Sequence, residues 1–400
     1  MIVFLLTVLA IAVTGGGFAG ATYYSVTIIY LVLGTLFVSY IYYFVKNRES
    51  LSLGSTEKCL IVFETWGLFY VLLSIAGVNR IMQADLAYEY SFIPRQAVYF
   101  FVLPAAILFR DDTYMKGFEW FLKRYGEILF WVLYAAQMLY FDEVMLTVMT
   151  QGLLCWLSLR LETNQRWRRW IRIIALLVTP LYGYGELTIL IIRMIFFIIC
   201  IVPKNWTRIV LCLVAAAVFL VVIGCFVLPQ AIDETAISDG SMSWRIQIWR
   251  EEEKILTNTH YLGGGYGTSY PSKTYAKEAV QRWEGQYIAG DGYTEYERMF
   301  VTGPHNSFMS LTMRTGIIGL LLFLLFLGSQ FWNIVKYRVP PSKSACFAIF
   351  AGIVMILFNV GLESPGYLLT FTFFMGVCIR EGKKLKEQSR SLQESNEAIA

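Results

Sequence analysis

Side chains that could bind and activate a substrate gather in one polar stretch, residues 229–305. Arg245 and Trp249 are four residues apart, so they share one face of a predicted helix that begins near Ser243. A guanidinium beside an indole is suited to binding phosphate or sugar hydroxyls. Equally, an amphipathic helix on a membrane surface would place Arg245 and Arg250 against lipid phosphates. Spacing alone leaves both interpretations open.

A glycine-rich turn follows this predicted helix. Gly263, Gly265 and Gly267 leave backbone amides accessible, so the turn could approach an anionic substrate without obstruction by side chains. The turn does not fit the phosphate-binding GxxxxGK[ST] pattern. Taken alone, it is more typical of a flexible connection.

The polar stretch ends at His305 and Asn306, where a further apolar segment begins. A neutral imidazole there could accept a proton from a sugar hydroxyl near neutral pH. The alternative is a histidine that only caps the helix. The chain has two histidines, and its seven cysteines lie in or beside apolar segments, so the sequence predicts neither a metal site nor a cofactor.

Composition indicates what must position these residues. The 400-residue chain is 57% hydrophobic and only 16% charged, with a mean hydropathy of +0.55 and a net charge of +4. These values disfavour a soluble enzyme and a nucleic-acid-binding protein. They predict an all-α polytopic membrane protein with about twelve spans, namely 2–14, 23–45, 59–78, 92–109, 127–141, 144–159, 171–184, 187–202, 209–228, 308–334, 345–362 and 366–380.

The basic residues predict the orientation. With both termini in the cytoplasm, 22 of the 33 Lys and Arg residues fall in inner loops, against only Arg80 and Arg95 in short outer loops. The expected organisation is about nine spans in 1–228, an extracytoplasmic loop at 229–305, three spans in 306–380 and a helical or disordered cytoplasmic tail at 381–400. An outer loop has no access to cytoplasmic nucleotides, so its substrate must be activated already, as a lipid-linked sugar is.

Arg193 is a second candidate site residue, because it lies inside the apolar segment 187–202. An unpaired cation is costly there and normally faces a partner or a wet cavity. Tyr184 and Glu186 are the expected neighbours. A purely structural role for Arg193 is equally compatible with the sequence.

The ordered set of motifs resembles the large outer loop of the O-antigen ligase and O-antigen polymerase superfamily of bacterial membrane glycosyltransferases. The set comprises Arg245 and Trp249, the glycine turn, His305-Asn306 and then Gly316-Ile317-Ile318-Gly319. The resemblance is concentrated in residues 243–320. It implies a metal-independent, membrane-embedded transferase that uses sugars carried on undecaprenyl pyrophosphate, in the bacterial inner or plasma membrane.

Carried over to this chain, the resemblance implies that Arg245 binds the donor pyrophosphate and that His305 activates the acceptor hydroxyl. Trp249, Arg250, Asn306 and the three glycines are expected beside the substrate. Many relatives have an arginine where residues 182–186 read Tyr-Gly-Tyr-Gly-Glu, and Arg193 is a candidate substitute. Arg314 stands where many relatives are acidic, and it adds a positive charge for the pyrophosphate or for lipid headgroups.

The leading functional hypothesis is a polymerase that joins lipid-linked repeat units of capsule, O-antigen or exopolysaccharide. A ligase that transfers the finished glycan is the nearest alternative. A polysaccharide flippase is less favoured, because polarity is concentrated in one outer loop rather than along several spans. Expected partners are the lipid-linked donor and acceptor, membrane lipids, a flippase and a chain-length regulator.

Overall fold

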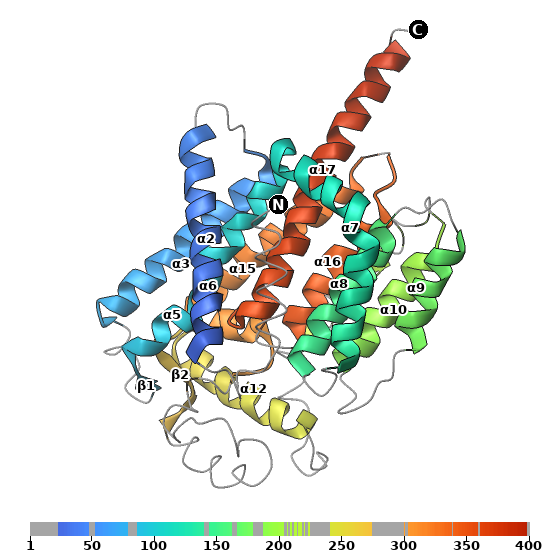
Figure 1. Cartoon of the computed structure of the whole chain (residues 1–400). Coiled ribbons are helices and arrows are strands. Elements are labelled where there is room, and N and C mark those ends of the chain that lie inside the picture. Colours follow the sequence, from blue (N-terminus) through green and yellow to red (C-terminus); the bar gives the residue numbers. More distant parts are fainter. Residues whose placement is uncertain are drawn as a thin grey trace.

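The computed structural model shows a bundle of helices with a small sheet at one end (Figure 1). The structure describes residues 23–47, 53–78, 86–139, 144–161, 166–178, 187–203, 241–273, 300, 303–337, 339–358 and 361–397, together with isolated positions between 206 and 224. All structural statements below concern these residues.

The amino-terminal part is a succession of helices that overlap most of the predicted spans. They are α2 (Tyr23–Asn47), α3 (Ser55–Ile75), α7 (Asp112–Leu139), α8 (Val144–Arg160), α9 (Arg166–Val178) and α10 (Leu187–Ile201). Helix α7 begins at Asp112, well before the predicted span 127–141. The predicted spans 2–14 and most of 209–228 lie outside the described residues.

The predicted span 92–109 is a bent segment rather than a straight helix. It contains η1 (Tyr90–Phe92), α5 (Ile93–Gln96), α6 (Val98–Val102) and η2 (Leu103–Arg110), with a bend of 48° between Tyr90–Gln96 and Val98–Arg110. Pro94 and Pro104 lie near the starts of α5 and η2. Proline has no backbone N–H and cannot continue a regular helix, which accounts for the interruptions.

The carboxyl-terminal part contains α12 (Ser241–Asn258), α15 (Ser307–Val335), α16 (Lys343–Leu357) and α17 (Pro365–Glu397). Helix α16 is almost wholly buried and packs against α17, α10 and α8, so it lies at the centre of the bundle. Strands β1 (Leu86–Tyr88) and β2 (Thr268–Ser272) form an antiparallel pair. The sequence did not predict this pair, which makes the chain mostly, rather than entirely, helical.

Within the described part of the chain, fewer helices are long and apolar enough to cross a membrane than the twelve spans that the sequence predicts. Among the described residues, Ser55–Ile75 and Ser307–Val335 are long and apolar enough to cross a membrane, and the bent segment would be a third span. Thr188–Ile201 and Lys343–Leu357 are apolar but shorter. Twelve spans therefore remain a prediction. Large apolar side chains exposed on α3 and α15, such as Leu72 and Leu321, suit contact with lipid.

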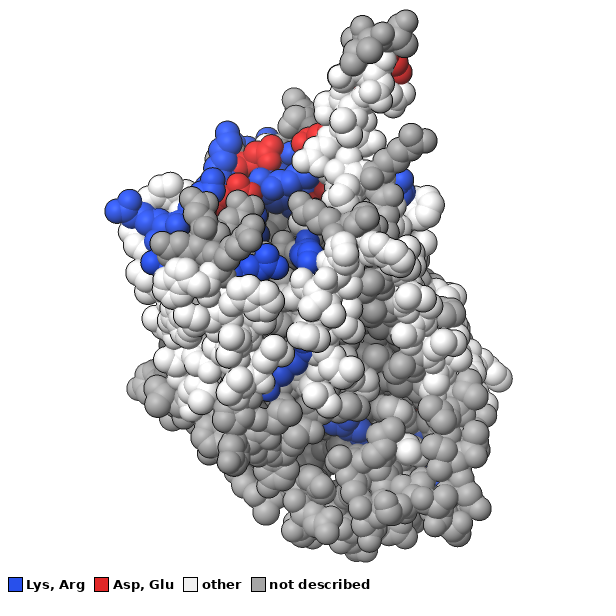
Figure 2. All heavy atoms as spheres, turned by 90° about the vertical axis from the view of Figure 1, so that its right-hand side faces the viewer, with Lys and Arg blue, Asp and Glu red and all other residues white. Residues whose placement is uncertain are grey.

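Helix α17 continues as one helix through most of the predicted tail and projects from the bundle at its carboxyl end (Figure 1). Ion pairs fasten its middle to α7, with Arg380 2.8 Å and Lys383 3.1 Å from the carboxylate of Asp112. Charged side chains gather at this end of the molecule (Figure 2). Several of the basic residues that the sequence places on the cytoplasmic side therefore lie together at one end of the fold.

Candidate functional site

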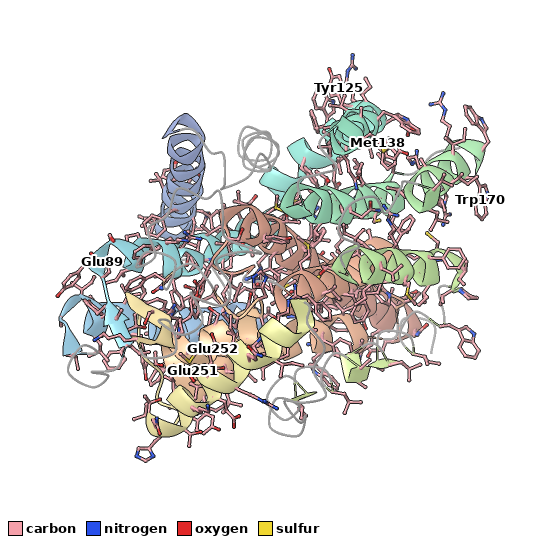
Figure 3. All side chains as sticks on the ribbon, turned by 90° about the horizontal axis from the view of Figure 1, so that it is seen from below. Glu89, Tyr125, Met138, Trp170, Glu251 and Glu252 are labelled. Atoms are coloured by element: carbon pink, nitrogen blue, oxygen red, sulfur yellow. The ribbon has the colours of Figure 1, made fainter. Side chains whose placement is uncertain are left out.

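Helix α12 lies across the end of the bundle opposite the projecting part of α17 (Figure 1). It begins at Ser241, two residues before the cap expected at Ser243. Its contacts are with α15 and β2, and the hydroxyl of Ser272 on β2 donates to Glu251 Oε1 at 2.6 Å. Figure 3 shows Glu251 and the adjacent Glu252 on this helix. The sheet and α12 together close the end of the bundle where α15 begins.

Trp249 connects α12 to the turn that carries His305. Its side chain is buried, and the indole Nε1 donates to the backbone oxygen of Pro304 at 2.6 Å. The predicted helix face of Arg245 and Trp249 thus meets the start of α15. Trp249 holds the backbone that leads into His305. Its described contact is therefore with the protein itself, not the sugar contact that the sequence suggested.

His305 occupies an unusual backbone conformation, with φ of +50°. This left-handed conformation is costly for residues other than glycine and persists only where the surroundings enforce it. Pro304 is held by Trp249 on one side. On the other side, Asn306 caps α15, because its Oδ1 accepts hydrogen bonds from Phe308 N at 2.9 Å and Met309 N at 3.4 Å. The imidazole is therefore placed by two fixed neighbours.

Asn306 itself is fully buried, and its Nδ2 has no hydrogen-bond partner among the described residues. The amide oxygen accepts the hydrogen bonds that cap α15, while the amide nitrogen keeps a donor for which the described residues offer no acceptor. The sequence predicted Asn306 to be a substrate-binding residue. Its described role is structural, and the remaining donor is compatible with that prediction.

Arg245 lies close enough to His305 to influence its ionisation. Burial, together with the positive charge of Arg245, lowers the pKa of His305 from 6.5 to about 4. Both residues keep partial solvent exposure. At neutral pH the imidazole is uncharged and can accept a proton, while the adjacent guanidinium attracts an anion. Arg250, the next basic residue on α12, is also partly exposed.

The glycine turn after α12 uses its amides for contacts within the protein. Gly265 N donates to Arg314 O at 3.0 Å, Tyr266 N to Ser74 Oγ at 2.8 Å and Gly267 N to Gln96 Oε1 at 2.7 Å. These donors are therefore not directed at a substrate. The geometry supports a docking role for the turn, and substrate binding by Gly263, Gly265 and Gly267 remains a prediction only.

The turn docks against a break in α15. Gly316 has φ of +71° and ψ of −177°, which interrupts the helix between two parts. A Cβ at Gly316 would lie 2.6 Å from Leu262 O, and one at Gly263 would lie 2.5 Å from Gly316 N. Both glycines are needed because the two backbones approach so closely. The Gly-Ile-Ile-Gly motif thus separates a short buried half-helix, 307–315, from the long apolar part of α15.

Arg314 belongs to this half-helix and is fully buried. Its Nη1 donates to both Thr268 O and Thr268 Oγ1 at 2.8 Å, and its guanidinium lies 4.1 Å from the ring centre of Tyr270. Its Nε lies 3.7 Å from Glu363 Oε1. Arg314 thus contacts β2 and the segment before α17. The predicted contact with a pyrophosphate or a lipid headgroup would need an exposed guanidinium, whereas the side chain of Arg314 is fully buried.

Sequence reasoning missed the carboxylates around Arg314. Glu363 accepts a hydrogen bond from Ser310 Oγ, and the same hydroxyl lies 2.9 Å from Tyr270 Oη. Glu252 on α12 is fully buried, burial raises its pKa well above the usual range, and neither of its oxygens has a hydrogen-bond partner in the described part of the chain. The available signal was spacing, because Glu252 is seven residues after Arg245 and so shares its helix face.

Arg193 lies away from this group, within the contact region of α7, α8 and α10. It is buried, and its Nη2 donates to Gln151 Oε1 at 3.3 Å. Gln137 Nε2 donates to the same oxygen at 2.9 Å. The partners expected from the sequence, Tyr184 and Glu186, lie outside the described residues. Arg193 therefore belongs to a polar cluster between helices, and its role as a second phosphate ligand stays a prediction.

Comparison with known proteins matches the region that contains these features. Residues 171–324, from α9 to the apolar part of α15, match the family described as O-antigen ligase (Wzy_C). This range includes α12, the glycine turn, His305 and the break at Gly316. No curated protein matches the chain. This match to part of the chain supports the resemblance to the O-antigen ligase and O-antigen polymerase superfamily.

Proposed function

We propose that this protein is a polysaccharide polymerase that joins oligosaccharide repeat units carried on undecaprenyl pyrophosphate, on the outer side of the bacterial cell membrane. The observation that carries the proposal is the proximity of a partly exposed Arg245 to His305, whose pKa of about 4 keeps the imidazole neutral. The family match and the apolar exterior support membrane glycosyl transfer.

In the proposed reaction, the guanidinium of Arg245 binds the pyrophosphate of the donor. His305 removes the proton from the acceptor hydroxyl as the hydroxyl oxygen attacks the anomeric carbon of the donor sugar. The bond between that carbon and the pyrophosphate oxygen breaks, and the lipid pyrophosphate leaves with the electron pair. Attack from the opposite face inverts the anomeric configuration. Arg245 stabilises the negative charge that develops on the leaving group.

A ligase that transfers a finished glycan to another acceptor is the second candidate, because the matching family is described as O-antigen ligase. The same two residues would serve either reaction, since both use a lipid pyrophosphate leaving group and a hydroxyl acceptor. The two functions differ in which lipid-linked species accumulates when the site fails.

The test replaces His305→Gln and Arg245→Gln separately in the producing cell and analyses the glycan at matched protein levels. The control variants are His260→Gln, the other histidine, and Lys254→Gln, an exposed cation on the same helix. We expect both site variants to lose polymer and both controls to keep it. Single lipid-linked repeats would support a polymerase, and long untransferred lipid-linked chains would support a ligase. Full-length polymer from both site variants would contradict the proposed roles.

A further inference from the structure

A second candidate site lies at the opposite end of the bundle from α12. A cavity of about 320 Å³ opens between α7, α8 and α17, beside residues 339–342 of the connection from α15 to α16 and the first turn of α16. Its volume is within the range of small-ligand pockets in proteins. The glycosyl-transfer residues take no part in it, so its occupant is separate from the proposed reaction.

One rim of this cavity is unusually rich in cations. Arg160 Nη2 lies 3.3 Å, Arg380 Nη2 3.4 Å and Lys384 Nζ 3.4 Å from a single oxygen, Glu119 Oε1. Lys383 and Arg380 also share Asp112. The remaining carboxylate at the rim, Glu381, accepts a hydrogen bond from Ser342 N at 2.6 Å. Three cations, Arg160, Arg380 and Lys384, thus line the cavity beside two carboxylates, Glu119 and Glu381, which leaves one excess positive charge in the lining.

The opposite wall of the cavity is apolar. Phe118 and Trp156 stack with their ring centres 6.2 Å apart, and Met115, Val377 and Leu385 continue the wall. The indole Nε1 of Trp156 and the Nε of Arg380 are buried donors without an acceptor among the described residues. A cationic rim beside an apolar wall matches a ligand that has an anionic head and a hydrocarbon body.

We propose that this cavity binds a phosphate group attached to an apolar body, with the phosphate at Arg160, Arg380 and Lys384 and the hydrocarbon along Phe118 and Trp156. Arginine forks form paired, charge-assisted hydrogen bonds with phosphate oxygens. The phosphate competes with Glu119 for the same three cations. An anionic phospholipid is one source of such a group, and a soluble phosphate compound is the other.

The experiment measures phosphatidylglycerol binding to the purified full-length protein in neutral detergent by native mass spectrometry. The test variant is Arg160→Gln/Lys384→Gln, and the matched control is Lys386→Gln/Arg390→Gln, which removes the same charge from exposed positions on α17. We expect the test variant to bind about tenfold more weakly, as the loss of charge-assisted hydrogen bonds implies, and the control to bind like the wild type. Glu119→Gln removes the competing carboxylate, so it should bind more tightly.

Two further probes identify the source of the phosphate. Phosphatidylcholine carries a compensating positive charge and should bind less well than phosphatidylglycerol. If inorganic phosphate displaces phosphatidylglycerol from the wild type, the ligand is a soluble phosphate; if it does not, the ligand is the lipid. Equal binding by the test and control variants would overturn the proposal, as would equal binding of the two lipids or weaker binding by Glu119→Gln.

Discussion

Arg245 and Arg314 lie on the two helices that meet at the candidate site, yet their surroundings differ. Arg245 on α12 is partly exposed and acts on the ionisation of His305. Arg314 on α15 is fully buried and is held by Thr268, Tyr270 and Glu363. The comparison shows that a cation near a predicted active site can serve the substrate or the fold. Exposure distinguishes the two arginines, and a substrate role for Arg245 remains a prediction.

The buried network of Arg314 also acts on the position of His305. It ties the half-helix 307–315 to β2 and to the segment before α17, while the glycine turn closes over Gly316. His305 stands at the start of this half-helix. We infer that Arg314 supports the site from within, whereas Arg245 faces the ligand.

The largest expected effect is at His305. The variant His305→Gln keeps a polar side chain and removes the base, so the rate of glycosyl transfer should fall by about 10²–10⁴-fold. Its unfolding temperature should stay close to that of the wild type. The measurement is transfer from a lipid-linked repeat unit by purified protein, with His260→Gln as the control. A rate within a factor of a few of the wild type would remove His305 from the mechanism.

Arg314 should show the opposite pattern. The variant Arg314→Met leaves the buried Glu363 without its cation, and we expect a loss of about 3–5 kcal/mol in the free energy of unfolding. Transfer per folded molecule should change little. Thermal unfolding and turnover normalised to folded protein separate the two quantities. The double variant Arg314→Met/Glu363→Gln should recover part of the stability. Lost turnover with unchanged stability would instead favour the substrate contact predicted from the sequence.

Replacing Arg245 should affect the reaction and spare the fold. The variant Arg245→Gln removes the charge expected at the leaving group, and transfer should slow by about 10²–10³-fold. Arg245→Lys keeps the charge without the planar fork, so it should recover part of the rate. Steady-state kinetics and thermal unfolding are the measurements, with Lys254→Gln as the control. A drop in stability as large as that of Arg314→Met would end the distinction between the two arginines.

Trp249 should give the smallest effect of this set. The variant Trp249→Phe keeps an aromatic ring and removes the donor to Pro304 O, at an expected cost of about 1 kcal/mol in stability. Because the turn before His305 loosens, kcat should fall more than KM rises. Kinetics over a range of acceptor concentrations test this pattern. An increase in KM alone would indicate that Trp249 binds the sugar directly.

Much of the fold was predictable because apolar segments and their ends are local properties. The segment 308–334 coincides closely with α15, and the helix expected to carry Arg245 and Trp249 is present as α12. The bend in 92–109 could have been anticipated from Pro94 and Pro104, but the pairing of β1 with β2 joins residues about 180 positions apart. Local sequence carries no signal for such a contact.

The site was predictable in its residue types but not in their roles. The glycines were identified, yet only the structure shows that the amides of Gly265 and Gly267 donate to Arg314 O and Gln96 Oε1. Glu252 and Glu363 were missed because a carboxylate in a polar loop, or in a short connection between apolar segments, is ordinarily exposed. Burial depends on packing between distant helices, which the spacing of residues along one helix does not specify.

The most direct test of the account is the ionisation of His305, because it needs no substrate. The full-length His260→Gln protein, labelled at histidine, contains one imidazole signal that can be followed by NMR against pH. The structure predicts a pKa of about 4, and this value should rise when Arg245→Gln is added. Because this pKa lies below the ordinary value of 6.5, the contribution of His305 to stability is complete above pH 6.5 and is lost as the pH falls toward 4. A pKa near 6.5 that is unchanged by Arg245→Gln would contradict a neutral base enclosed beside a guanidinium.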